Sequence, residues 1–164
     1  MAIWARLKNM SPWEVFQLLK VSIRQPRFVI PTMKATRQSI KFCDELFGGD
    51  HHENNRTNAF RHAFWNYLIC EQCYKVCNSV EKSMEWSKKI TDLHEELAPN
   101  DERAKLMDLH NNQIGRELFK RYYSEENFDI IPVLTEEMQR AVKISKTEEI
   151  SGQQGRMVYI EDRL

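Results

Sequence analysis

The sequence predicts an all-α fold: a compact, single-domain bundle of about six helices followed by a short extended C-terminal tail. Five glycines and five prolines among 164 residues are fewer than a turn-dense β architecture uses. Signals for the start and end of helices also recur along the chain. A chain of this length buries most of its apolar surface without disulfides or metal ions as structural supports. We therefore expect one helical domain over residues 1–150 and a tail over residues 151–164.

Proline and glycine delimit the first two predicted helices, which form a basic amphipathic segment over residues 1–50. Residues 11–14, Ser-Pro-Trp-Glu, supply an N-cap, a proline in the first turn and a capping-box glutamate. The helix that they start should end near residue 24, ahead of Pro26. A second helix should cover residues 32–47 and end at the Gly-Gly pair that follows. Its expected inward residues are Met33, Ile40, Phe42, Cys43 and Leu46.

The remaining helices are predicted from apolar spacing and capping residues. A third helix should span about residues 57–77, and a fourth should run from residue 79 to just before Pro99. Asn100 is the expected N-cap of a fifth helix that ends near residue 122. A last helix should extend from Thr135 through Ile144. Residues 54–120 thus form the motif-bearing core of the predicted domain.

Two segments lie outside these helices. Residues 48–55 form a polar loop in which His51 and His52 are expected on the surface, with metal binding as the less favoured alternative. Residues 157–160, Met-Val-Tyr-Ile, have a strand-like composition, but the sequence offers no obvious partner strand. The tail is therefore either docked on the domain or disordered.

Cys70, Cys73 and Cys77 lie at i, i+3 and i+7, which is one face of a helix. Reduced thiols packed in the core are the favoured interpretation, because free cysteine behaves as a small buried hydrophobe. Zinc binding is the alternative, and it requires a fourth ligand such as Cys43 or His51.

Charge is balanced overall but not along the chain. The 24 basic residues equal the 24 acidic ones, so nucleic acid is an unlikely partner. Residues 1–41 contain eight Lys and Arg residues against Glu14, a local charge of 8 − 1 = +7. This segment is either a solvated helix face or a surface for peripheral contact with an anionic membrane. Neither a signal peptide nor a membrane-spanning stretch is evident, so we expect a cytoplasmic protein with peripheral membrane contact as a variant.

Three polar motifs interrupt otherwise apolar helices. They are Asn58-Ala-Phe-Arg61-His62-Ala-Phe-Trp65, Asp92-Leu-His94-Glu95 and Met107-Asp108-Leu-His110-Asn111-Asn112. Burying such groups is costly unless they satisfy one another or bind a ligand. We therefore expect either a functional site or a structural polar network where the motifs meet.

A divalent metal ion of unspecified identity is the expected cofactor. Its candidate ligands are His62, Asp92, His94, Asp108 and His110. Residues two apart on an ideal helix point about 200° apart, so the Asp and His of one Asp-Leu-His cannot both bind the same ion.

Other residues of the motifs suit catalytic or positioning roles. His62 and Glu95 are candidate acid–base groups. The expected substrate-positioning residues are Arg61, Asn111, Asn112 and Arg116. Gly115 lies inside a predicted helix, where glycine costs about 1 kcal/mol relative to alanine. Close packing or access to a ligand must offset that cost.

The three motifs together resemble a bacterial domain family of unknown function. Its members occur as small stand-alone proteins and at the carboxy-terminal ends of larger toxin-like secreted polypeptides. The resemblance covers about residues 54–120 and leaves residues 1–50 and 125–164 outside. It implies a compact helical domain with a polar site, and the toxin context implies hydrolytic activity.

The favoured function is a metal-assisted hydrolase of a phosphoester, with phospholipid as a substrate class. No Gly-x-Ser-x-Gly elbow, phosphate-binding glycine-rich loop or His-Glu-x-x-His helix is present. The alternative is a non-enzymatic helical binding or interaction protein whose motifs form a buried structural network.

Overall fold

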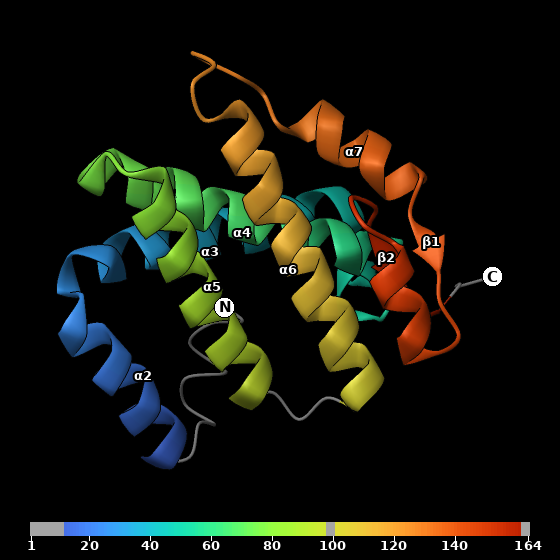
Figure 1. The fold of residues 1–164 in the computed structure, drawn as a ribbon, viewed down its shortest axis with the longest axis horizontal. Helices are drawn as coiled ribbons and strands as arrows, with labels where there is room; N and C mark the ends of the chain where they lie inside the picture. The colour runs from blue at the N-terminus through green and yellow to red at the C-terminus, as the bar shows by residue number, and fades with distance from the viewer. Residues whose placement is uncertain (1–11, 98–100, 162–164) are drawn as a thin grey trace.

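The computed structural model describes residues 12–97 and 101–161 and confirms the all-α class (Figure 1). The first eleven residues of the basic segment, and residues 162–164 of the tail, lie outside this description. The α-helices are α2 (Pro12–Arg24), α3 (Val29–Phe47), α4 (Arg56–Cys77), α5 (Val80–Leu97), α6 (Glu102–Tyr122) and α7 (Ile131–Gln139). Short 3-10 segments are η1 (Pro26–Phe28), η2 (Asp50–His52) and η3 (Thr147–Gly152), and two short strands are β1 (Val142–Lys143) and β2 (Val158–Tyr159).

Helix α4 is the centre of the bundle. It packs against α3, α5, α6 and α7, and Figure 1 shows α6 crossing in front of it. The helix begins at an N-cap, Asn55, whose Oδ1 accepts hydrogen bonds from the amides of Thr57 and Asn58 at 3.0 and 3.1 Å. It ends at Asn78, which has a left-handed conformation with φ of 49°. Because α4 has neighbours on several sides, polar residues along it are buried as well as apolar ones.

Gly115 marks the closest approach of α4 and α6. A Cβ at this position would lie 2.0 Å from the carbonyl oxygen of Ala63. Close helix packing is therefore the reason for glycine inside α6, one of the two explanations that the sequence left open.

Apart from the last helix, helix boundaries agree with the predictions to within a few residues, while the N-cap of α6 and the inward face of α3 differ from them. The N-cap of α6 is Asp101, whose Oδ1 accepts from the amide of Ala104 at 2.9 Å, and not the predicted Asn100, which lies outside the described residues. On α3 the fully buried residues Ala35, Ser39 and Cys43 share one face at i, i+4 and i+8. The predicted inward residues Met33 and Leu46 are exposed by 42% and 52%, because that face turns away from α4.

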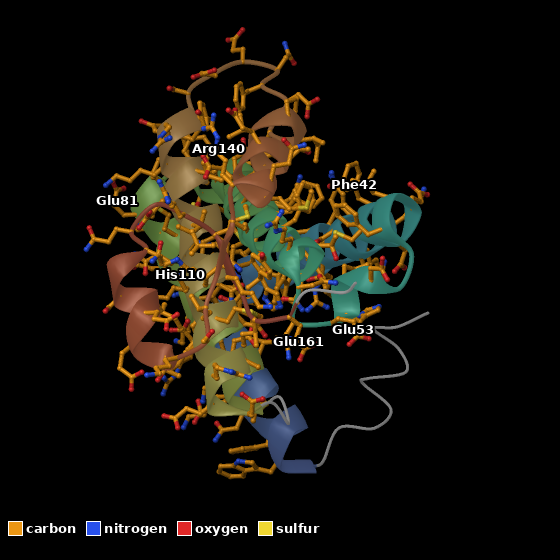
Figure 2. All side chains as sticks on the ribbon, turned by 90° about the vertical axis from the view of Figure 1, so that its right-hand side faces the viewer. Phe42, Glu53, Glu81, His110, Arg140 and Glu161 are labelled. Carbon is orange, nitrogen blue, oxygen red and sulfur yellow. The ribbon has the colours of Figure 1, made fainter. Side chains whose placement is uncertain are left out.

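The C-terminal part corrects the predicted last helix. Helix α7 ends at Gln139, and the chain then forms β1, which pairs in parallel with β2 in the register Val142 to Val158. Both β2 residues are buried, so the tail docks on the domain as far as residue 161. The amides of Ile160 and Glu161 donate to the carbonyl of Asn54 at 2.9 Å, and Figure 2 shows Glu161 close to Glu53.

The cysteines are free thiols, as predicted. Cys43, Cys70 and Cys73 are buried, and burial raises the pKa of each of these thiols to about 12. Cys77 is half-buried at the end of α4. Within residues 12–97 and 101–161, no helix is both long enough and apolar enough to cross a membrane.

Candidate functional site

The centre of the bundle contains a histidine and two carboxylates from three different helices. His62 lies on α4, Glu95 on α5 and Asp108 on α6, and their side chains are exposed by only 3%, 1% and 3%. Each offers one nitrogen or carboxylate oxygen, and these three atoms lie within 4.8 Å of one another. We call these three residues the buried triad.

Each ring nitrogen of His62 faces a different pair of groups. Nε2 lies 2.8 Å from an Nη2 of Arg61 and 3.3 Å from Oδ1 of Asp108. Nδ1 lies 3.1 Å from Oδ1 of Asn112 and 3.5 Å from Oε1 of Glu95. Because a guanidinium only donates, Nε2 is the acceptor in this arrangement and Nδ1–H donates to the amide oxygen. The neutral Nδ1–H tautomer of His62 therefore fits these contacts.

Two asparagines connect the buried triad to its surroundings. Asn112 donates to Oε1 of Glu95 at 3.0 Å, and Asn66 donates to Oδ1 of Asn112 at 2.6 Å. Oδ1 of Asn66 in turn accepts from Nη1 of Arg116 and from Oγ of Ser87, each at 2.9 Å. A buried amide with both ends bonded fixes its own rotamer and that of its neighbours. The asparagines therefore hold the triad in one geometry.

The electrostatics of the site centre on Asp108. Burial raises the pKa of this carboxyl well above its ordinary value of 3.8, and the charge of Glu95 raises it further. Arg61 acts in the opposite direction on the same pKa. Burial also lowers the pKa of Arg116, although a guanidinium stays charged in proteins. Two carboxylates and two guanidinium groups thus lie in or beside a site with little water.

The structure does not bring all predicted metal ligands together. His110 is half-buried, and its Nε2 lies 2.8 Å from the carbonyl oxygen of Arg156, at the outer side of α6 (Figure 2). Asp92 forms an ion pair with Lys88 along α5. His94 packs edge-on against Trp65 with ring centroids 5.0 Å apart. Asp108 points inward while His110 points outward, as expected for residues two apart on a helix.

Among the predicted positioning residues, Arg61, Asn112 and Arg116 join the site. Asn111 does not, because both ends of its amide bond the backbone of Val158 in β2: Nδ2 donates to the carbonyl at 2.8 Å and Oδ1 accepts from the amide at 3.0 Å. Asn111 therefore attaches the tail to α6.

The sequence reasoning missed two hydroxyl residues of the site. Ser87 and Thr91 are fully buried, and both donate to Oδ1 of Asn66. Together with Glu95 they lie at i, i+4 and i+8 on α5, so they form one polar stripe on the buried face. The i, i+4 and i+8 spacing is the feature of the sequence from which these two residues could have been identified.

A groove lies between α5, α6 and η3. Its volume is about 490 Å³, and its charged lining residues are Lys88, Asp92, Glu96, Lys105 and Arg116. Arg116 is only 7% exposed, and it is the residue that both lines the groove and bonds Asn66. The groove and the buried triad are thus connected through one guanidinium.

Comparison with known proteins identifies a family. No curated protein and no solved structure matches the chain. A family model described as a domain of unknown function, DUF6973, matches residues 19–142. The match extends beyond the expected residues 54–120 on both sides and includes every residue of the buried triad. The chain therefore belongs to the DUF6973 family of domains of unknown function.

Proposed function

We propose that the protein is a metal-assisted hydrolase of phosphoesters whose divalent ion is held by His62, Glu95 and Asp108. The observation that supports this proposal most strongly is the convergence of these three buried groups from three helices within 4.8 Å. Buried charges of one sign are costly unless a cation or a proton compensates them. A divalent cation is the compensation that also supplies hydrolytic chemistry.

His62 Nε2 and Asp108 have the spacing of two ligands of one ion, whereas Glu95 must first turn, because its Oε1 lies 3.5 Å from the other ring nitrogen, Nδ1. Bonds of about 2.1 Å place neighbouring ligand atoms about 3 Å apart and opposite ones about 4.2 Å apart. The 3.3 Å between His62 Nε2 and Asp108 Oδ1 lies in this range. One imidazole and two carboxylates suit Zn, Mn or Fe. For such an ion to bind at Nε2, the guanidinium of Arg61 must leave that nitrogen.

The other residues then have distinct roles. A bound divalent ion would supply a nucleophile by lowering the pKa of water. Glu95 would hold the ion through one carboxylate oxygen and accept the proton of the water with the other. Asn112 fixes the orientation of Glu95 through its 3.0 Å hydrogen bond. Arg61, released from His62, and Arg116 bind phosphate oxygens through their guanidinium groups.

The groove and helix α2 support a phosphorylated substrate, and phospholipid in particular. Lys88, Lys105 and Arg116 line the groove with positive charge, although Asp92 and Glu96 offset part of it. On α2, the exposed residues Trp13, Phe16 and Ile23 share one helical face with the basic Lys20 and lie near Arg24. Exposed aromatic and basic residues on one helix are typical of peripheral membrane contact. Substrate headgroups in a membrane would then lie within reach of the domain.

The alternative function is a non-enzymatic helical binding or interaction protein in which the polar residues only stabilise the bundle. Two observations favour it: Arg61 donates to the same His62 nitrogen that an ion would occupy, and the triad is almost completely buried. A network of this kind is stable without any ion, provided that each of its polar groups is bonded.

Elemental analysis of protein purified without an affinity tag tests the proposal. We expect the buried triad to hold one equivalent of divalent metal in the wild type and in Glu117→Gln, an exposed control on the same helix as Asp108. Glu95→Gln, which keeps the size of the side chain, should contain one equivalent less than the wild type and lose the hydrolysis of bis(4-nitrophenyl) phosphate and of phospholipid vesicles. Its melting temperature without metal should stay close to that of the wild type.

Two results would refute the metal-dependent function. One is a metal content, and a rise in melting temperature on adding Zn, Mn, Mg or Ca, that are the same in the wild type and in Glu95→Gln. Saturation at 100 times the dissociation constant should stabilise the fold by about 2.7 kcal/mol. The other is strong unfolding of Glu95→Gln in metal-free buffer, which indicates a structural network.

A further inference from the structure

A second group of ligand-type side chains lies at the C-terminal end of α3. Asp44 is on α3, while His51 and His52 are in η2, and one ligand atom from each lies within 4.8 Å of the others. Gly48, with φ of 59°, reverses the chain after α3 and returns residue 51 to the level of residue 44. We call these three residues the α3–η2 cluster. It shares no residue with the buried triad.

His51 corrects the prediction of an exposed loop histidine, and its bonding is incomplete. The side chain is 0% exposed, and Nε2 lies 2.8 Å from Oδ1 of Asp44. Nδ1 is buried and has no hydrogen-bond partner among the described residues. A buried ring nitrogen without a partner is costly. A cation on Nδ1 would use it, while Nε2–H donates to the carboxylate, as in carboxylate–histidine–metal arrangements.

The other two residues open the cluster to solvent. Asp44 has a side chain that is 53% exposed, and His52 is exposed, with its ring centroid 4.1 Å from that of His51. Solvent therefore reaches this cluster from the side of Asp44 and His52, whereas all three residues of the buried triad are buried. Two imidazoles, with the carboxylate of Asp44 orienting the ring of His51 and open positions for water, are a ligand set for divalent transition metals such as Zn²⁺, Co²⁺ or Fe²⁺.

We propose that Asp44, His51 and His52 form a second binding site, specific for a divalent transition-metal cation and independent of the buried triad. The site would join the end of α3 to the segment that starts α4. In that segment, which contains Glu53 in Figure 2, the side-chain amide of Asn55 donates to the carbonyl of Asp50 at 3.0 Å. Asn55 is also the N-cap of α4, the helix on which His62 lies. The cation thus fixes the entry into the central helix.

Calorimetric titration of the metal-free, tag-free full chain with Zn²⁺ tests this site. Asp44→Asn keeps an oxygen that accepts from His51, and His52→Gln changes an exposed side chain, so neither should unfold the protein. Each should weaken Zn²⁺ binding by about tenfold or more. Glu45→Gln is the matched control, because Glu45 is the exposed neighbour of Asp44 and pairs with Lys41 at 3.8 Å. Its Zn²⁺ affinity should stay within about twofold of the wild type.

Two further measurements separate this site from the proposed hydrolytic centre. The double variant Glu95→Gln/Asp108→Asn should retain one equivalent of Zn²⁺, whether or not the buried triad binds metal. Zn²⁺ should also shift the imidazole ¹⁵N resonances of His51 and His52 in that variant. Wild-type affinity in both Asp44→Asn and His52→Gln, or unchanged resonances of these two histidines at saturating Zn²⁺, would overturn the proposal.

Discussion

Replacing Gly115 with alanine should destabilise the protein by about 2 kcal/mol. The added Cβ would lie 2.0 Å from the carbonyl oxygen of Ala63 and 2.8 and 2.9 Å from its carbonyl carbon and Cα. Carbon and oxygen atoms in contact stay about 3.3 Å apart, so α4 and α6 must separate by roughly 1 Å. All three contacted atoms belong to the backbone, and no side-chain rotation relieves the clash. Overpacking at the upper end costs about 3 kcal/mol, and the better helix propensity of alanine returns about 1 kcal/mol.

Urea denaturation followed by circular dichroism measures this effect. With a slope of about 2 kcal/mol per molar urea, the midpoint should fall by about 1 M. The control is Gly152→Ala, because nothing lies within 4 Å of a Cβ at that position. The free energy of unfolding of the control should stay within about 0.5 kcal/mol of the wild-type value. Equal midpoints for the two variants would show that α4 and α6 do not approach each other as closely as the structure indicates.

Two further predictions concern α6. In metal-free protein, burial and Glu95 raise the pKa of Asp108 above 3.8, so the folded state keeps a proton that the unfolded chain releases. The free energy of unfolding should therefore fall as pH rises from about 4 toward the raised pKa, and Asp108→Asn should remove this part of the pH dependence. Urea midpoints of the two proteins at several pH values measure the effect. The same pH dependence in the wild type and in Asp108→Asn would contradict a raised pKa of Asp108. Asn111→Ala should destabilise the fold by about 2–4 kcal/mol, since it leaves the amide and carbonyl of Val158 without their bonds to this side chain. Hydrogen exchange at the Val158 amide should accelerate in this variant, and unchanged exchange would show that the tail is held by other contacts.

Local signals explain how much of the fold the sequence predicts. Caps, prolines and apolar spacing act within a few residues, so the helix positions follow from them, as the start of α2 at Pro12 and the end of α3 before Gly48 illustrate. The pairing of β1 with β2 joins Val142 to Val158 and depends on a non-local contact. Local composition indicated the strand at residues 158–159 but could not indicate its partner, so β1 was predicted as helix.

The candidate site was also predictable only in part, because helix geometry is a local property and helix packing is not. Helical geometry showed that Asp108 and His110 point in different directions, but it could not show which of them faces α4. That choice depends on the close crossing at Gly115, where α6 meets α4 next to His62. The burial of His51 was equally invisible, because a left-handed turn at Gly48 returns the loop onto α3. The motifs indicated which segments form the site, whereas tertiary packing determines which of their side chains lie in it.

Arg61 determines which of the two functions the buried triad can serve. The charged groups that contact His62 are Arg61, Glu95 and Asp108. With Asp108 protonated, the remaining carboxylate and the guanidinium have opposite charges that balance. With both carboxylates ionised, one negative charge remains among these three groups, and a cation is favoured. Burial and Glu95 favour the first state in the absence of metal, since both raise the pKa of Asp108. Metal binding must therefore release a proton from Asp108 and displace Arg61 from His62. The released guanidinium becomes available to a phosphate only after the ion has bound, so metal binding should precede substrate binding.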